Sequence, residues 1–168
     1  CVPNFSEGRD LTIIKQITNE IEAVDGVKLL DVDPGAATNR TVVTFVGEPA
    51  AVIEAAYRAI VKAGELIDMS KQTGEHARMG ATDVCPLVPV ANISMEETAE
   101  WSIKLAKRVG ETTDIPVYLY GAAQPDTNRK VLSIIRGGEY EGFFEKIKKP
   151  EWKPDFGPAV YNARKGAT

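Results

Sequence analysis

Apolar residues recur along the chain with two periods, and each period predicts one class of element. From Arg9 to Val24, spacings of three and four predict a helix with one apolar face, made by Leu11, Ile14, Ile17, Ile21 and Val24. Gly26 breaks this pattern. Runs rich in apolar or β-branched residues over Val27–Val32 and Thr41–Val46 then predict two strands.

The rest of the chain continues the alternation of helix and strand. Pro49 predicts the first turn of an alanine-rich helix that runs to about Ile67. Val84–Val90 reads as a strand at a sheet margin, because its two prolines cannot donate ladder hydrogen bonds. Ser94 and Glu97 have the spacing of a capping box that opens a helix to about Val109. Further predictions are a strand over Pro116–Tyr120, short helices near Asn128–Ile135 and Glu139–Lys148, and a loop from Pro150.

This order of elements predicts an α+β fold. We expect a mixed β-sheet with helices packed on one face, in a ferredoxin-like arrangement. No repeat, low-complexity stretch or interior linker divides the chain, so residues 1–168 are predicted to form one unit.

Composition and charge exclude several classes of function. The 168 residues are 43% hydrophobic and 26% charged, which is typical of a globular domain. A net charge of −4 gives no electrostatic reason to bind nucleic acid or an anionic membrane, and no apolar run approaches the roughly 20 residues of a membrane span. Two distant cysteines, Cys1 and Cys85, form neither a disulfide framework nor a metal motif, so we expect a cytoplasmic location.

The only histidine of the chain is the first candidate for chemistry. His76 lies between Gly74 and Gly80, and an imidazole can take or give a proton near neutral pH. Glu75 and Asp83 are candidates for orienting it or raising its pKa. The alternative is a surface histidine without function, beside two solvated acids.

Three other segments carry polar residues. In the loop Pro3–Arg9, the expected role is helix initiation, with Ser6 or Asp10 as the cap. In the connection from Asp31 to Arg40, turn chemistry explains Pro34-Gly35 but not Arg40, which could present a planar fork to a carboxylate.

The third segment is the stretch from Asp155 to Gly166. It combines an aromatic ring and two cations, which would suit an aromatic ligand with a carboxylate, although a solvated tail has the same composition. No phosphate loop, dinucleotide fingerprint or zinc spacing is present. The residues alone therefore indicate an α+β domain with an acid/base candidate and an anionic ligand.

Several motifs in order along nearly the whole chain resemble one known family, the N-terminal subdomain of the formiminotransferase domain. The motifs are Cys1–Gly8, Asp31–Asp33, Thr38–Val42, Gly74–Ala81, Asp83–Pro86, Pro116–Gly121 and Pro154–Pro158. The resemblance implies transfer of the formimino group of N-formimino-L-glutamate to N5 of tetrahydrofolate, in histidine degradation and one-carbon metabolism. Tetrahydrofolate is then a co-substrate, and no metal is implied.

The resemblance also implies roles for residues. His76 matches the family's catalytic histidine, and a neutral imidazole there could accept the proton that N5 loses. The family's folate-contacting stretch falls on Gly157, Pro158, Ala159, Val160, Tyr161, Asn162, Ala163, Arg164, Lys165 and Gly166. By position, Asp33, Asn39 and Arg40 would line the same cleft. Chemistry favours Arg40 for a carboxylate, and Asp33 or Asn39 for an amidine or pterin nitrogen.

The chain resembles only part of the family's transferase unit, in which folate lies between two subdomains. We therefore expect a segment of a longer protein that needs a C-terminal subdomain for activity. Two alternatives are a stand-alone, non-catalytic module that binds folate or partner proteins, and a related formyl-group transferase. Family members are commonly homodimers, so a homo-oligomer is also expected.

Overall fold

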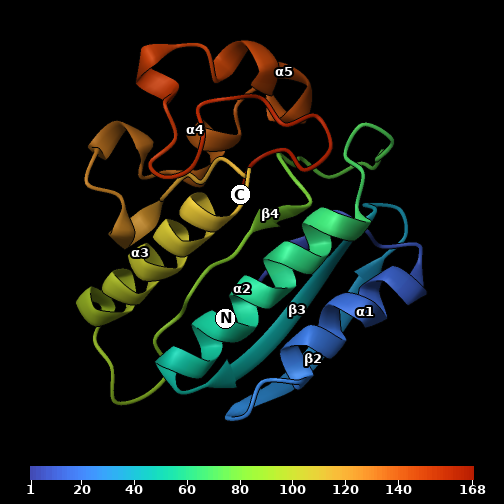
Figure 1. The fold of residues 1–168 in the computed structure, drawn as a ribbon, viewed down its shortest axis with the longest axis vertical. Helices are drawn as coiled ribbons and strands as arrows, with labels where there is room; N and C mark the ends of the chain where they lie inside the picture. Colours follow the sequence, from blue (N-terminus) through green and yellow to red (C-terminus); the bar gives the residue numbers. More distant parts are fainter.

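A computed structural model describes residues 1–168, and its first half is a β-α-β-β-α-β unit (Figure 1). The elements are β1 (Asn4–Phe5), α1 (Leu11–Glu22), β2 (Val27–Gly35), β3 (Arg40–Gly47), α2 (Pro49–Leu66) and β4 (Thr82–Val84). The strand order is β2-β3-β1-β4, and every pairing is antiparallel. This confirms the α+β fold and the ferredoxin-like arrangement.

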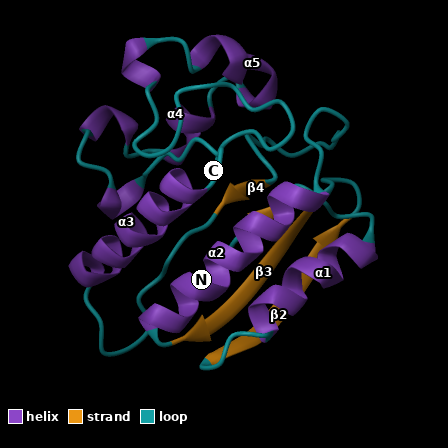
Figure 2. Cartoon of the chain, in the orientation of Figure 1, coloured by secondary structure: helices purple, strands orange, loops and turns teal.

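The second half adds helices around the β4 side of this unit. Its elements are α3 (Met95–Thr112), α4 (Leu132–Arg136), α5 (Glu139–Lys146) and three short 3₁₀ helices, η1 (Gly121–Ala123), η2 (Thr127–Arg129) and η3 (Pro150–Trp152). Helix α3 lies beside α2 and begins with the predicted capping box of Ser94 and Glu97 (Figure 2). None of the helices combines the length and the apolarity that a bilayer span requires.

Helices α1 and α2 cover only one face of the sheet (Figures 1 and 2). Along β3, Thr41, Val43 and Phe45 point toward these helices and are at most 1% exposed. The alternate residues Arg40 and Val42 are half-buried, because successive side chains of a strand point to opposite faces. The opposite face of the sheet therefore has no helix over it.

The predicted strand over Pro116–Tyr120 does not join the sheet. Val117 forms an isolated antiparallel bridge with Phe156, and a cavity of about 200 Å³ separates this segment from residues 84–87. The prediction of a sheet strand there is therefore wrong, and because every pairing in the sheet is antiparallel, the sheet is not mixed. Strand β4 is also shorter than Val84–Val90, because prolines follow closely and cannot extend the ladder.

The apolar face of α1 is shorter than its sequence pattern. Asp10 caps the helix by accepting hydrogen bonds from the backbone N–H groups of Thr12 and Ile13. Leu11, the first helical residue, is 63% exposed, whereas Ile21 is fully buried against the sheet and α2. The buried stripe therefore starts one turn later than the spacing predicts.

Ile21 and Leu11 both fit the helical period, but only Ile21 is buried, so truncating each side chain should show that burial sets the loss of stability. We expect Ile21→Ala to lower the free energy of unfolding by about 3 kcal/mol, because it removes buried methyl groups and leaves a cavity. Leu11→Ala, the matched control on the same helix, should change it by less than about 0.5 kcal/mol. Urea unfolding followed by circular dichroism measures both, and equal losses would contradict this account of the core.

A second apolar cluster joins α4 and α5 to the C-terminal residues. Its buried members are Met79, Tyr118, Ile135, Phe143, Ile147 and Ala167. The ring of Tyr118 meets that of Phe143 edge-on, and its hydroxyl donates to the Trp152 carbonyl at 2.7 Å. Burial raises the pKa of Tyr118, and the charge of Arg129 opposes that rise.

This raised pKa predicts a loss of stability at alkaline pH. The unfolded chain ionises its tyrosines near pH 10, while the folded chain keeps Tyr118 protonated and so binds more protons. Stability from this group is thus complete below about pH 10 and falls above it, by at most about 1.4 kcal/mol per pH unit. Tyr118→Phe should remove this part of the slope, and urea unfolding between pH 8 and 11 tests it. An unchanged slope in the variant would contradict the assignment.

Candidate functional site

The buried amide of Asn39 fastens three segments together at one end of the sheet. Its Oδ1 accepts from the backbone N–H of Gly8 at 3.0 Å, and its Nδ2 donates to the Thr73 carbonyl at 2.9 Å. Gln72 donates its side-chain amide to the Asn39 carbonyl at 3.0 Å. Asn39 has a φ of 48°, a left-handed conformation that asparagine tolerates well. The β1–α1 loop, the β2–β3 turn and the histidine loop (residues 70–81) are thereby held side by side.

A second set of contacts fixes the C-terminal end of the histidine loop. The Asp83 side chain, fully buried, accepts from the Met79 N–H at 2.9 Å and forms an ion pair with Arg136 of α4. Arg78, also buried, donates to the Gln72 side chain at 2.7 Å and pairs with Glu141 of α5. Because each buried charge has its partner, the loop is anchored on both sides.

The C-terminal stretch lies directly against this loop. Gly80 and Gly166 form an antiparallel bridge, and the Ala81 N–H donates to the Lys165 carbonyl at 2.8 Å. A Cβ on Gly80 would lie 2.1 Å from the Ala167 carbonyl oxygen, so only glycine permits this approach. The stretch that the family resemblance assigns to folate therefore also supports the histidine loop, through these backbone contacts at its C-terminal end.

The imidazole of His76 is held by one contact on each ring nitrogen. Nδ1 lies 2.6 Å from the Ala77 carbonyl oxygen, and Nε2 contacts Nη1 of Arg40. A carbonyl can only accept and a guanidinium can only donate, so Nδ1 carries the hydrogen and Nε2 the lone pair. His76 is thus a neutral imidazole whose proton-accepting nitrogen faces Arg40.

Arg40 connects the histidine to the sheet. Its Nη2 donates to the side-chain oxygen of Asn4 on β1, while its Nε is buried without a hydrogen-bond partner. Burial lowers the pKa of the Arg40 guanidinium, the charge of Arg136 lowers it further, and Asp83 opposes both. No carboxylate forms an ion pair with Arg40, which leaves a half-buried cation next to the imidazole.

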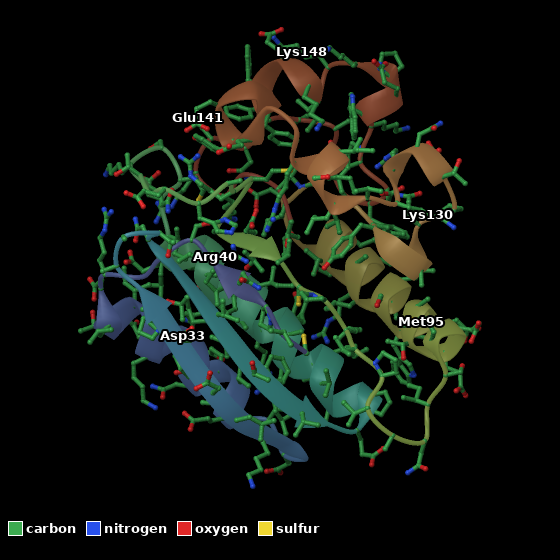
Figure 3. The ribbon with its side chains drawn as sticks, turned by 180° about the vertical axis from the view of Figure 1, so that it is seen from behind. Asp33, Arg40, Met95, Lys130, Glu141 and Lys148 are labelled. Atoms are coloured by element: carbon green, nitrogen blue, oxygen red, sulfur yellow. The ribbon has the colours of Figure 1, made fainter.

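Asp33 lies on the same open face as Arg40. It pairs with Val42 across the β2–β3 ladder, and Val42 is two residues from Arg40, so all three side chains project from one side. Figure 3 labels Arg40 and Asp33 in the view from behind, which looks onto the face of the sheet opposite α1 and α2. The Asp33 carboxylate is exposed and makes no hydrogen bond within the chain, so it is free to meet a ligand.

Some of the remaining predicted residues have side chains bonded or packed within the chain, and the others are exposed. Both ends of the Asn39 amide are used within the chain. The Glu75 side chain is exposed and forms no hydrogen bond or ion pair with His76, whose ring nitrogens contact Ala77 and Arg40. In the stretch 157–166, Arg164 donates to the Glu65 carbonyl and Lys165 pairs with Asp114. Tyr161 packs against rings of α5, whereas Ala159, Val160 and Ala163 are exposed. The stretch is therefore anchored by its cations and open between its ends.

Sequence reasoning missed three contributors to the site. Asn4 lies in β1 rather than in the predicted loop, and its side-chain oxygen accepts a hydrogen bond from Arg40. Gln72 and Arg136 received no role, although one braces the histidine loop and the other neutralises Asp83. For Asn4, the only signal in the sequence is its place in the motif Cys1–Gly8. Arg136 lies 53 residues from Asp83, and no local pattern links them.

Loss of the Asn39 amide should loosen this corner. We expect Asn39→Ala to lower the free energy of unfolding by about 3 kcal/mol, because it leaves the Gly8 N–H and the Thr73 carbonyl unpaired. Asn92→Ala is the matched control, since Asn92 also has a positive φ (57°) but is exposed. Comparison of the two by urea unfolding cancels the backbone effect, and equal losses would show that the bridging amide is unimportant.

Comparison with known proteins gives a consistent family. The sequence model described as "Formiminotransferase domain, N-terminal subdomain" matches residues 1–168. Formimidoyltransferase-cyclodeaminase of Dictyostelium discoideum and that of Gallus gallus are each 54% identical over 168 residues, covering 100% of the chain and 31% of either protein. Glutamate formimidoyltransferase of Thermoplasma acidophilum is 47% identical over 162 residues, covering 95% of the chain and 54% of that protein.

These matches confirm the resemblance seen in the motifs around His76 and Arg40. The chain spans about a third to about a half of the length of these curated relatives. The match to the Dictyostelium discoideum and Gallus gallus proteins covers all 168 residues, and therefore every element that builds the site. The chain therefore belongs to the family of N-terminal subdomains of the formiminotransferase domain.

Proposed function

We propose that this chain supplies the catalytic base of a glutamate formimidoyltransferase, which moves the formimino group of N-formimino-L-glutamate to N5 of tetrahydrofolate. The observation that carries the proposal is His76, a neutral imidazole with its hydrogen on Nδ1 and its lone pair on Nε2 at the edge of an open sheet face. Relatives that match 95 to 100% of the chain are named formimidoyltransferase-cyclodeaminase or glutamate formimidoyltransferase, which supports the reaction class.

The chemistry fits an imidazole without a redox step. N5 attacks the formimino carbon, a new C–N bond forms, and the proton that N5 loses passes to Nε2 of His76. The imidazolium then returns this proton to the glutamate nitrogen as the second C–N bond breaks and glutamate leaves. The Ala77 carbonyl accepts from Nδ1–H throughout and stabilises the charged ring.

We assign the predicted polar residues to the two substrates by their chemistry. In this proposal Arg40 binds a carboxylate of the glutamate, since a guanidinium offers two parallel donors, and Asp33 meets an amidine or pterin nitrogen. The exposed middle of the stretch 157–166 lies next to the folate. Asn39 acts indirectly, because its amide is already occupied in holding the loops.

The open sheet face is the place for a second subdomain. We propose that such a subdomain covers it and encloses both substrates, because Asp33, Arg40 and Val42 project from a face without helices. The larger size of the relatives supports this arrangement. Exclusion of water there would strengthen the interactions of Arg40 with an anionic substrate. A homodimer is a further part of the proposal that gel filtration can test.

The His76→Gln variant tests the proposal. In a polypeptide that joins this chain to the second subdomain, we expect turnover to fall at least about 100-fold, since a positioned base contributes that much or more. The assay is formation of 5,10-methenyltetrahydrofolate after acid treatment. Lys71→Gln is the control, because Lys71 is an exposed residue of the same loop that pairs only with Asp68.

The same assay separates this function from a binding module. Turnover in the joined polypeptide but not in the 168-residue chain would support a split site. Folate binding without turnover in either would favour a non-catalytic module, and unchanged turnover in His76→Gln would refute the role of the base.

A further inference from the structure

Arg40 occupies the one nitrogen that His76 needs for chemistry. The only lone pair of the ring that can accept a proton is on Nε2, because Nδ1 carries its hydrogen and donates to the Ala77 carbonyl. Nη1 of Arg40 lies on that lone pair. In the free chain, the imidazole is correctly oriented but its basic atom is covered.

The guanidinium itself is poorly satisfied in this position. Its partners are two neutral groups, the imidazole and the Asn4 amide, and its buried Nε has no partner. The nearest buried carboxylate, Asp83, is already used by Arg136 and by the Met79 N–H. A half-buried cation without an anion is not compensated for its lost hydration, and an incoming carboxylate can supply the missing ion pair.

Movement of Arg40 would not disturb the rest of the site. The histidine loop is held by Asn39, Arg78 and Asp83, none of which bonds to the Arg40 side chain. The imidazole keeps its orientation through Ala77. Arg40 can therefore change partners while the catalytic geometry stays fixed.

We propose that Arg40 gates the base: it covers Nε2 of His76 in the free chain, and a substrate carboxylate draws the guanidinium away and frees the lone pair. The identity of that carboxylate as part of glutamate rests on the proposed function, but the covering contact does not. Arg40 is then a positioning residue that also sets specificity for the formimino-donating substrate. A substrate whose carboxylate cannot reach Arg40 leaves Nε2 of His76 covered.

Diethyl pyrocarbonate measures whether the lone pair is free. Nε2 attacks a carbonyl carbon of the reagent, forming the N-carbethoxy imidazole and releasing ethanol and carbon dioxide, and absorbance near 240 nm follows the product. The chain has a single histidine, so the signal reports His76 alone, and His76→Gln gives the blank. We expect Arg40→Gln to be modified roughly tenfold faster than the wild type, as expected for loss of a hydrogen bond from a charged donor. Arg9→Gln, which removes an exposed arginine, should react like the wild type.

Glutarate tests release by a carboxylate without needing a variant. Millimolar glutarate should accelerate modification of the wild type and leave Arg40→Gln unchanged. Equal rates in wild type and folded Arg40→Gln would overturn the covering contact. A slower or unchanged rate of the wild type in glutarate would overturn release by a carboxylate, and this arm still decides if Arg40→Gln does not fold.

The outcomes distinguish the gate from the proposed reaction. Acceleration by glutarate with no formimino transfer in the joined polypeptide would keep the gate and reject the transferase assignment. Transfer without acceleration would keep the transferase and reject the gate.

Discussion

The bridging amide of Asn39 is the interaction on which the site depends. It joins backbone groups 31 and 34 residues away, and through them it places the histidine loop over the end of β3. Asparagine meets two demands at this position, because it tolerates a positive φ and its side chain offers both an acceptor and a donor. Without this bridge, the loop that carries His76 would be held less firmly against Arg40, the first residue of β3.

The charged groups of the site are of two kinds: closed groups, which are paired within the chain, and open groups, which have no ionic partner. The Asp83–Arg136 pair is closed, since the carboxylate is fully buried and has an ionic and a backbone partner. Arg78 is closed in the same way by Gln72 and Glu141. Arg40 and Asp33 are open, one a cation without an anion and the other an exposed carboxylate on the same sheet face. Closed pairs give the loop its rigidity, and open groups remain for a ligand.

Local patterns predicted the elements well where neighbours along the chain decide the outcome. The Ser94 capping box, the start of α2 at Pro49 and the break at Gly26 all appear as expected, because caps and breakers act within one turn. Predictions failed where distant contacts decide. The segment Pro116–Tyr120 has strand composition, yet its neighbour is Phe156 and a cavity lies between it and β4. Leu11 fits the helical period, but nothing covers it.

The sequence by itself determined the helices and most strands, the α+β class, the family, and His76 as the residue to examine. Only the tertiary structure decided which face of the sheet stays open, that the Asn39 amide is bonded within the chain at both ends, and which atoms meet the imidazole. The physical reason is separation along the chain: Arg40 reaches His76 across 36 residues and Arg136 reaches Asp83 across 53. Such pairings depend on the register of strands and the packing of loops, which no local periodicity encodes.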